Sequence, residues 1–282
     1  MVAGCRDEMA QAWTEEARLA ALRACEILDT PSEIEFDELI EAACEICDAP
    51  IGVVNFVDAE RQWFKAVRGL ELSETPRDVS ICAHAILGRD LLVVGDTFED
   101  ERFRDNPLLH GEPQLRFYAG ALLTTHDGLP LGTVCVLDHK PRPEGLTPGQ
   151  TRALKALAQA AMRLVEMRVA SDRIRASETR FRDIADKMPQ MVWSTLPDGF
   201  HDYYNARWYE FTGVPVGSTD GEAWNGMFHP DDQERAWKAW RNSLATGEPY
   251  EIEYRLRHRS GAYRWVLGRA LPVRDDAGRI IR

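Results

Sequence analysis

The pair Cys82 and His84, in residues 80–86, has the residue types for nucleophilic chemistry. An imidazolium beside a thiol lowers the thiol pKa and makes the sulfur a nucleophile. Residues two apart on a helix point in different directions, however, so this spacing argues against a working pair. We therefore interpret Cys82 as a structural thiol, and keep a redox dithiol with Cys135 and a thioether link to a bilin as alternatives.

The cysteines as a set are predicted to be buried thiols. The chain has six, at positions 5, 25, 44, 47, 82 and 135. Cys44 and Cys47 form one CxxC in a predicted helix, without the further Cys or His ligands that a structural zinc needs. A flavin–thiol photocycle needs a sulfur nucleophile, and no cysteine follows Cys135, so the second half cannot support one. We predict no metal and no flavin, bilin or haem cofactor.

The bulk composition indicates a folded chain of two domains. Its 282 residues allow two cores, because domains commonly contain about 100–200 residues, and 44% hydrophobic with 28% charged is ordinary for globular proteins. The net charge of -12 repels nucleic acid and anionic membranes, so neither is expected as a partner. No stretch reaches the ~20 apolar residues of a membrane span, and the acidic start does not fit a signal peptide, which predicts a cytoplasmic protein.

Hydrophobic periodicity in the first half predicts two helices and an antiparallel sheet. Apolar residues recur at steps of three and four over residues 15–28 and 35–47, which is typical of amphipathic helices. Apolar runs at residues 51–58, 62–69, 90–96, 117–125 and 131–138 then predict strands. Residues 97–114 between them form a long excursion without clear periodicity, and a loop of that length inside a domain is usually functional or disordered.

The segment from Thr147 to Met188 is predicted to form one continuous helix or two abutting ones, since neither Gly nor Pro lies between Gly149 and Pro189. Its apolar residues form two runs with steps of three and four: Leu154, Leu157, Ala161 and Leu164, then Met167, Ala170, Ile174, Ser177, Phe181, Ile184 and Met188. This heptad seam predicts a parallel dimeric coiled coil, with a discontinuity near Leu164. The alternative is a helix that packs on its own domains. We expect the signalling surface at Leu157, Leu164, Met167, Ile174, Phe181 and Ile184.

From Pro189 the period changes to two, which predicts a second, smaller antiparallel sheet with helices on one face. Residues 192–196 and 201–205 flank a Pro-Asp-Gly turn and read as a hairpin. Residues 250–257 alternate apolar and charged side chains, so one face of that strand is expected to meet water. His229 and Pro230 open a helix whose buried stripe is Trp237, Trp240 and Leu244.

Ordered motifs of the first half resemble GAF domains of bacterial sensor proteins. They are EILDT (26–30), RQWFKAVRGL (61–70), SICAHAI (80–86), DERFRDNPLL (100–109), LRFYAGALL (115–123) and LGTVCVLD (131–138). Residues 178–282 resemble PAS domains through WYEFTG (208–213), FHPDD (228–232), the stretch 251–273 and DDAGRI (275–280). The resemblance implies an α+β chain of two domains, each a central antiparallel sheet with helices, joined by a long helix.

The resemblance also implies the domain boundaries. It places an N-terminal tail at residues 1–14, a GAF domain at 15–165, a helical linker that continues the last GAF helix at 166–188, and a PAS domain at 189–282. PAS domains of this type end with a further strand, so we expect the last strand to be truncated.

Chains of this arrangement resemble the sensory region of histidine kinases of two-component systems, HWE type included, and less often of diguanylate cyclases. We find no GGDEF or EAL string and no nucleotide-binding loop, so no catalytic residue is predicted. The implied partners are a second copy of the chain, an unknown small molecule, and a response regulator reached through an output domain. A stand-alone thiol redox enzyme using Cys82 and Cys135, or a chromophore-binding photosensor, are the alternatives.

A small ligand, if one binds, is expected over the GAF sheet and under the excursion. The candidate lining residues are Trp63, Phe64, Cys82, His84, Asp96, Phe103, Phe117 and Tyr118, and in the PAS half Trp193, Tyr203, Phe211, Trp224 and Trp265. The alternative is that these aromatic residues are ordinary core. Bilin-binding GAF domains place Cys directly before His, but here Ala83 intervenes, and the signature that would accompany a bilin on Cys5 is missing. His201, His229 and His258 are available to haem, which we do not expect.

Overall fold

A six-stranded antiparallel sheet organises the first part of the chain in the computed structural model, which describes residues 13–110 and 114–282. Its strand order is β3-β2-β1-β6-β5-β4. The strands are β1 (Ile51–Val57), β2 (Arg61–Arg68), β3 (Glu74–Pro76), β4 (Leu91–Val94), β5 (Phe117–Thr124) and β6 (Pro130–Asp138). Every residue of the central strands β1 and β6 is buried, which explains why both are continuous apolar runs.

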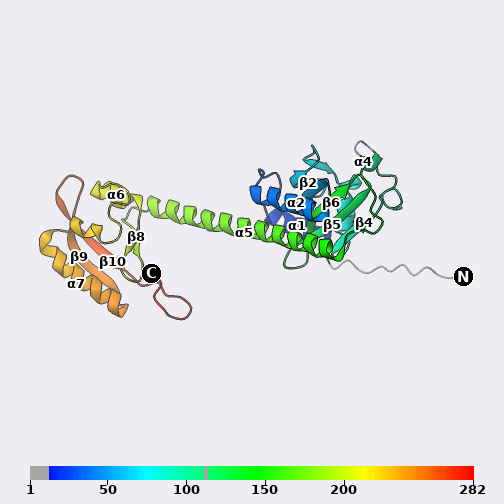
Figure 1. Cartoon of the computed structure of the whole chain (residues 1–282). Coiled ribbons are helices and arrows are strands. Elements are labelled where there is room, and N and C mark those ends of the chain that lie inside the picture. The colour runs from blue at the N-terminus through cyan, green and yellow to red at the C-terminus, as the bar shows by residue number, and fades with distance from the viewer. Residues whose placement is uncertain (1–12, 111–113) are drawn as a thin grey trace. The chain divides into compact units, whose positions relative to one another are not determined.

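Helices cover one face of this sheet and short elements cover the other. Beside this sheet lie α1 (Glu15–Ala24), α2 (Ile34–Cys47) and the first half of α5 (Pro148–Lys187) (Figure 1). Their apolar side chains share one core with the sheet. On the opposite face lie η1 (Arg77–Val79), α3 (Ile81–Ala85), α4 (Pro107–His110) and the excursion at residues 97–110. Both amphipathic helices and all five expected strands are therefore present. Cys5 and most of the expected tail at residues 1–14 lie outside the described residues.

The first helix ends earlier than its periodicity predicts. Apolar spacing continues to residue 28, whereas α1 ends at Ala24. Glu26 and Asp29 have positive φ angles of 47° and 58°, and a helix cannot continue through such residues. Periodicity alone therefore overextended this helix, since it reports which side chains are buried and not where the backbone turns.

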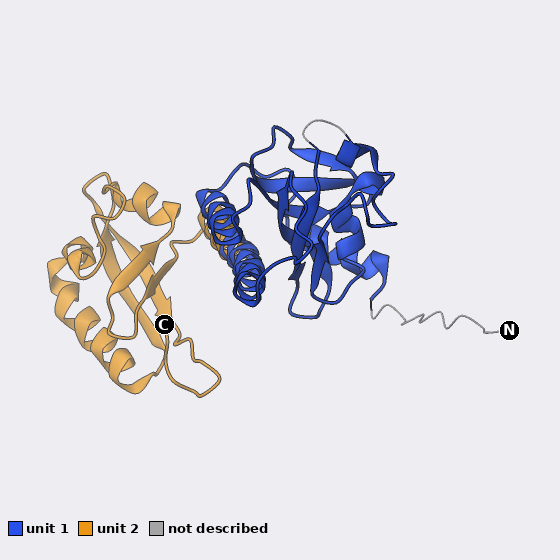
Figure 2. Cartoon of the chain, turned by 45° about the vertical axis from the view of Figure 1, so that its right-hand side comes forward, with its two compact units in different colours: residues 1–173 blue, residues 174–282 orange. Residues whose placement is uncertain are grey.

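The chain divides into two units, residues 1–173 and residues 174–282 (Figure 2). In the second unit, β7 (Trp193–Thr195) pairs with β8 (His201–Tyr204), and β9 (Tyr250–Arg257) pairs with β10 (Tyr263–Ala270), in two antiparallel ladders. The helical elements are α6 (Ala206–Thr212), η2 (Ala223–Met227) and α7 (Pro230–Thr246). Strand β9 alternates buried and exposed residues as predicted, so the chain is an α+β protein in both units.

Helix α7 begins as its sequence predicts, but its buried positions are Asp232, Ala236 and Trp240, while Trp237 and Leu244 are only partly buried against the same core. The side chain of His229 accepts a hydrogen bond from the backbone N–H of Asp231, and Pro230 follows at the first helical position. Asp232, next in this turn, is buried and accepts hydrogen bonds of 2.9 Å from both the backbone N–H and the Nε of Arg255 on β9. The arginine holds the pKa of this carboxyl well below its usual range. The pair thereby fixes the helix start to the strand.

Asn205 joins the end of α5 to the second unit. Its fully buried side chain donates to the carbonyl oxygens of Ala185 at 2.8 Å and Gln190 at 2.9 Å. Its Oδ1 accepts from the N–H of Val192 at 2.9 Å and from that of Trp208, which caps α6. One amide therefore satisfies backbone groups of α5, of the segment before β7 and of α6.

We expect Asn205→Ala to lower the free energy of unfolding of the second unit by about 1–3 kcal/mol, because it leaves buried backbone groups without partners. Urea unfolding followed by tryptophan fluorescence measures this directly, since six of the eight tryptophans lie between residues 193 and 265. Asn242→Ala, at an exposed position of α7, is the matched control. Equal midpoints for the two variants would contradict the role assigned to Asn205.

Candidate functional site

Two cysteines and several hydrogen-bond donors meet inside unit 1, on the sheet face opposite the long helices. Cys82 Sγ on α3 lies 3.9 Å from Cys135 Sγ on β6, and both side chains are buried. The hydroxyl of Tyr118 and the Nε2 of Gln62 each lie 3.3 Å from the sulfur of Cys82. A cavity of about 60 Å³ lies against both thiols. We call these residues, with Asn55, the thiol cluster.

Ser80 sets the orientation of Gln62. Its Oγ caps α3 by accepting from the N–H of Ala83 at 3.0 Å, and its hydroxyl donates to the Oε1 of Gln62. Because Oε1 is then an acceptor, the amide nitrogen of Gln62 faces Cys82 as a donor.

Asn55 is oriented by the neighbouring strand in the same way. Its Nδ2 lies 3.2 Å from the carbonyl oxygen of Thr133, which can only accept, and 2.8 Å from the Thr133 hydroxyl. The same nitrogen lies 3.4 Å from the sulfur of Cys82 and 3.6 Å from that of Cys135. Its Oδ1 is buried without a hydrogen-bond partner among the described residues. The cluster therefore presents donors to the sulfur of Cys82, whereas the thiol of Cys135 also has an acceptor, the carbonyl oxygen of Val53 at 3.5 Å.

This environment separates the ionisation of the two cysteines. Burial by itself raises the pKa of Cys82, but hydrogen bonds from Cys135, Thr133, Tyr118 and Asn55 outweigh it and lower the pKa to about 7. The pKa of Cys135 is raised, because its thiol donates to Cys82 and is buried. Elsewhere in the unit, burial raises the pKa of Cys44 to about 11. Cys82 is thus set apart as the thiol most easily ionised.

The structure brings together only part of the predicted GAF-type site. Phe64, Cys82 and Tyr118 line the cavity, and Phe103 belongs to the same apolar cluster. His84 packs its ring edge-on against Phe103, with centroids 5.0 Å apart, and its Nδ1 lies 3.2 Å from the carbonyl oxygen of Ser80. Its imidazole is therefore engaged away from Cys82, as the spacing of two suggests.

Trp63 and Phe117 are corrections to the predicted pocket. Both lie in the core on the helix-covered face of the sheet. Successive residues of a strand point to opposite faces, so neither can share a pocket with its neighbour Phe64 or Tyr118. Asp96 is a further correction, because its carboxylate is bound by Arg116, with an Nε–Oδ1 distance of 2.8 Å, which lowers its pKa. Its role here is to fix the base of the excursion.

Asn55, Gln62 and Ser80 were not identified from the sequence as site residues. A signal was present for the first of them: a polar amide stands inside the apolar run of residues 51–57. A polar residue in a fully buried strand must find internal partners, which marks it as part of a network. The partners themselves come from other strands and could not be read from the sequence.

In the second unit, aromatic rings enclose His201 on β8. Its ring centroid lies 4.7 Å from that of Trp224, 5.1 Å from Trp193, 5.6 Å from Tyr204 and 5.9 Å from Trp240. Burial lowers the pKa of this histidine to about 4. The space beside it is only about 20 Å³, so the predicted site residue Trp224 serves as core here, while Trp193 is partly buried against the same cluster.

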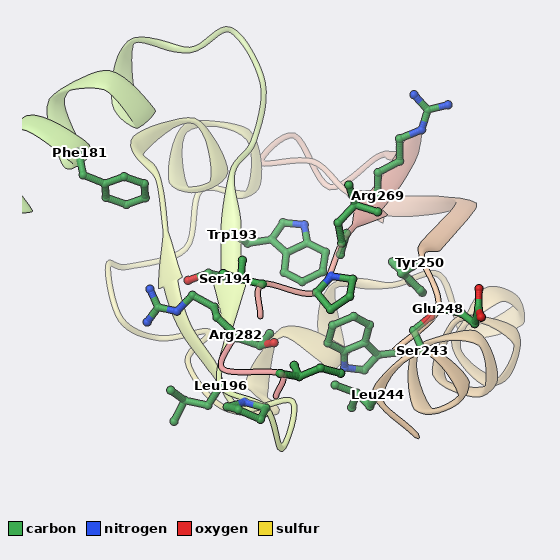
Figure 3. A pocket seen from close by; sticks show the side chains of 18 residues that line it. Phe181, Trp193, Ser194, Leu196, Ser243, Leu244, Glu248, Tyr250, Arg269 and Arg282 are labelled. Atoms are coloured by element: carbon green, nitrogen blue, oxygen red, sulfur yellow. The ribbon is translucent and has the colours of Figure 1, made fainter. Parts of the chain in front are cut away.

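A larger pocket of about 420 Å³ lies next to this core, between β7, α7 and the segment after β10 (Figure 3). Trp193, Tyr250 and Leu244 form part of its wall, and Phe181 contributes from α5. In Figure 3 the guanidinium of Arg269 points away from the other labelled side chains. The lining of this pocket is mainly apolar.

The other predicted PAS-type residues lie apart from one another. The ring of Tyr203 packs against Phe181, and Phe211 packs against His258. Trp265 is 66% exposed and is a correction. It is paired in register with Arg255 on β9, so it lies on the sheet face that carries the charged side chains and cannot line the interior.

Comparison with known families decides the nature of the two units. Residues 30–166 match the family model of the GAF domain, and residues 201–282 match that of the PAS fold. The chain carries a GAF domain followed by a PAS domain. Both are sensory modules, so this is an input region for signal transduction.

Relatives of known name share only part of this chain. A stretch of 128 residues, 45% of the chain, is 44% identical to a cyclic di-GMP phosphodiesterase of Pseudomonas aeruginosa and covers 22% of it. A stretch of 116 residues, 40% of the chain, is 34% identical to a peroxide stress-activated histidine kinase of Schizosaccharomyces pombe and covers 5% of it. The chain thus matches less than a quarter of the length of either relative.

Among solved structures, the Escherichia coli DhaR(N)–DhaL complex contains a chain similar in fold, with a TM-score of 0.54 and 11% identity. The similarity covers 95% of this chain and 88% of that one. At this identity the likeness concerns the fold alone. Within residues 13–110 and 114–282, no helix has the length and apolarity to cross a membrane.

The buried histidine of the PAS domain should make its stability depend on pH. Above pH 6.5 His201 is neutral in both the folded and the unfolded state, and its contribution is fully present. Between pH 6.5 and about 4 the unfolded chain binds a proton that the folded domain does not, so stability falls with falling pH. The loss amounts to about 3 kcal/mol over this window.

Urea unfolding at a series of pH values, followed by tryptophan fluorescence, measures this dependence. His201→Phe should flatten the pH dependence in that window, whereas His126→Gln, at an exposed position, should leave it unchanged. A His201→Phe variant with the slope of the parent protein would show that another group is responsible.

Proposed function

We propose that this chain is the input region of a sensor histidine kinase of a two-component system, and that it acts as a parallel homodimer joined along the second half of α5. The observation that carries the proposal is an exposed apolar stripe on that half of the helix. Met167 is 68% exposed, Ile174 61%, Phe181 53% and Ile184 51%. Steps of seven, seven and three place them on one side of the helix.

The occupant that fits this stripe is a second copy of the same helix. Burial of a large apolar side chain stabilises an interface by roughly 1.5–3 kcal/mol, and a heptad seam supplies one such residue for each half-heptad. The residues between the seam positions are largely charged, such as Arg175, Glu178 and Arg182. A seam with charged flanks favours a coiled coil over a helix that packs on its own domains.

The first half of the predicted seam has a different role. Leu154 and Ala161 are buried in the GAF core, and Leu157 and Leu164 are half-buried against it. The discontinuity in the heptad pattern falls between Ala161 and Met167, where the helix passes from buried to exposed. The proposed dimer contact therefore begins near Leu164, and the sequence break marks the end of packing on the GAF domain.

Both domains are fixed to the helix that would carry the signal. The buried face of the first half belongs to the GAF core. At the other end, Asn205 holds the carbonyl oxygen of Ala185, and the carboxylate of Asp186 accepts from the N–H of Ala206 at 2.7 Å. A change of packing in either domain would then act on the same dimer seam, and a coupling of about 1–3 kcal/mol is enough for regulation.

Three histidine kinases of fission yeast, 26–34% identical over their matched stretches, support a kinase as the output. A second candidate output is cyclic di-GMP turnover, including the diguanylate cyclase expected as the alternative, which is favoured by the 44% identity to the Pseudomonas phosphodiesterase. The kinase proposal includes a response regulator as partner, a small-molecule ligand and a cytoplasmic location. The five described cysteines, all free thiols, are compatible with a reducing compartment.

The output class can be tested on the protein isolated from its native host. Autophosphorylation with labelled ATP, with loss of the label in acid as expected of phosphohistidine, would support the kinase. Hydrolysis or synthesis of cyclic di-GMP without autophosphorylation would support the second candidate and remove the first.

The dimer seam predicts the effect of single charges. Ile174→Glu and Phe181→Glu should each weaken dimerisation of the 282-residue chain by about 10- to 100-fold, because each places two carboxylates in an apolar seam. Sedimentation equilibrium measures the dissociation constant, and circular dichroism checks that α5 still forms. Thr179→Glu, on the outer side of the same helix, is the matched control. An oligomeric state that is the same in all three variants and the parent chain would exclude the coiled-coil contact.

A further inference from the structure

We propose that Cys82 and Cys135 form a hydroperoxide-reactive dithiol inside the GAF domain, in which Cys82 is oxidised first and Cys135 then closes a disulfide. The proposal assigns a chemical input to the thiol cluster and does not depend on the output class or on the dimer seam. It stands on the geometry of the cluster: two buried sulfurs 3.9 Å apart, in van der Waals contact, with a cavity against both.

Donors on three different strands surround the sulfur of Cys82. They are the amide of Asn55 on β1, the amide of Gln62 on β2 and the hydroxyl of Tyr118 on β5, at 3.3–3.4 Å. A neutral thiol needs few such partners, whereas a buried thiolate is costly unless donors replace its water. The arrangement therefore matches the needs of a thiolate at this position.

The two cysteines have complementary roles. Hydrogen bonds hold the pKa of Cys82 near 7, so a large fraction of it is thiolate at neutral pH, while the raised pKa of Cys135 keeps that group protonated. The thiolate is the nucleophile in attack on a peroxide, and a neighbouring thiol is what resolves the product. A purely structural pair of thiols would not need this asymmetry.

The size and lining of the cavity limit the oxidant to a small molecule. A water needs roughly 10–15 Å³ of such space, so a cavity of about 60 Å³ has room for hydrogen peroxide but not for a bulky organic substrate. Leu108, Leu109 and Leu115, from the excursion and the residues after it, form part of its lining. Both cysteines beside it are buried.

The chemistry balances with hydrogen peroxide as the only co-reactant. The thiolate of Cys82 attacks one peroxide oxygen, the O–O bond breaks, and an S–O bond forms, giving a sulfenic acid and hydroxide, which takes up a proton to become water. Cys135 then loses its proton and attacks the sulfur of Cys82, so that an S–S bond forms and the S–O bond breaks. The departing hydroxide takes that proton as water. In sum, two thiols and one peroxide give one disulfide and two waters.

Disulfide formation requires the two cysteines to move closer together, and the fold indicates which of them moves. The sulfurs must approach from 3.9 Å to about 2.05 Å. Cys135 lies in β6, which is paired on both sides, with β1 and β5, whereas Cys82 lies in the five-residue helix α3. Most of the displacement is therefore expected at α3.

Cys44 and Cys47 supply an internal control for reactivity. Both are buried like the proposed pair, but burial raises the pKa of each. At pH 7 the thiolate fraction of Cys44, with a pKa near 11, is about 10⁴-fold lower than that of Cys82. The greater nucleophilicity of a more basic thiolate offsets part of this difference, so Cys82 should react roughly 100-fold faster than Cys44.

The experiment treats the reduced 282-residue chain with hydrogen peroxide at pH 7, followed by alkylation and peptide mass spectrometry. We expect a disulfide between Cys82 and Cys135 before any oxidation of Cys44 or Cys47. In Cys135→Ser, dimedone present while the peroxide-treated chain is unfolded in urea should trap a sulfenic acid on Cys82. In Cys82→Ser, Cys135 should react no faster than Cys44. Equal oxidation rates at all four buried thiols would overturn the proposal.

The pH dependence of the oxidation rate of Cys82 distinguishes a reactive thiolate from a thiol that is merely accessible to peroxide. The oxidation rate of Cys82 should rise with pH to a plateau with a midpoint near 7. Tyr118→Phe removes one donor and should move this midpoint upward and lower the rate at pH 7 by about 3- to 10-fold. Circular dichroism confirms that each variant is folded, and the alanine variant at the same position, Cys82→Ala or Cys135→Ala, replaces a serine variant that is not. A midpoint above 9 in the parent chain would overturn the assignment of Cys82 as the reactive thiolate.

Discussion

The complete burial of β1 and β6 is the constraint on which the GAF domain depends. Strands buried on both faces must find internal partners for most of their polar groups, since water cannot reach them. Asn55 and Thr133 face each other across this pair in register, and their side chains bond to one another. The close approach also needs Gly132, because a Cβ there would lie 1.9 Å from the carbonyl oxygen of Asn55. The thiol cluster is thus built into the centre of the sheet and is not an addition at its edge.

Helix α5 must also have its apolar surface covered, but no single domain covers all of it. A 40-residue helix has far more surface than either domain can cover, so its sides are divided among partners. The GAF core takes Leu154, Ala158 and Val165, and the PAS domain takes the carbonyl oxygen of Ala185 through Asn205. The apolar stripe from Met167 to Ile184 is what remains. Its exposure is the cost of linking two domains by one helix, and a second copy of the chain would remove that cost.

Much of the fold could be predicted from the sequence because it follows from local periodicity. The amphipathic pattern of α2, the continuous apolar strands and the alternation of β9 each report burial directly. Two errors at the sites, Trp63 and Phe117, were avoidable, since adjacent strand residues point to opposite faces. Trp265 was not, because its exposure depends on its register with Arg255 on β9. The pair Cys82 and Cys135 was an alternative from the sequence, but the amides of Asn55 and Gln62 beside it were beyond reach, as they meet the sulfurs only through the strand order.

The two strands that flank α5 in the sequence each hold a residue of one buried site, either the thiol cluster or the aromatic cluster around His201. Strand β6 precedes the helix and holds Cys135, and β7 follows it and holds Trp193, which contacts His201. Between β6 and α5, Arg142 donates to the carbonyl oxygen of Cys47 at 2.7 Å and pairs with Asp138. Before β7, Asn205 binds the N–H of Val192.

The connections on both sides of the helix are therefore held by buried or half-buried hydrogen bonds rather than left as free loops. The part of a displacement at either site that reaches β6 or β7 would have little slack to absorb it before α5. This short, tied path is the physical reason to expect that chemistry at the cysteines and packing around His201 act on the same helix.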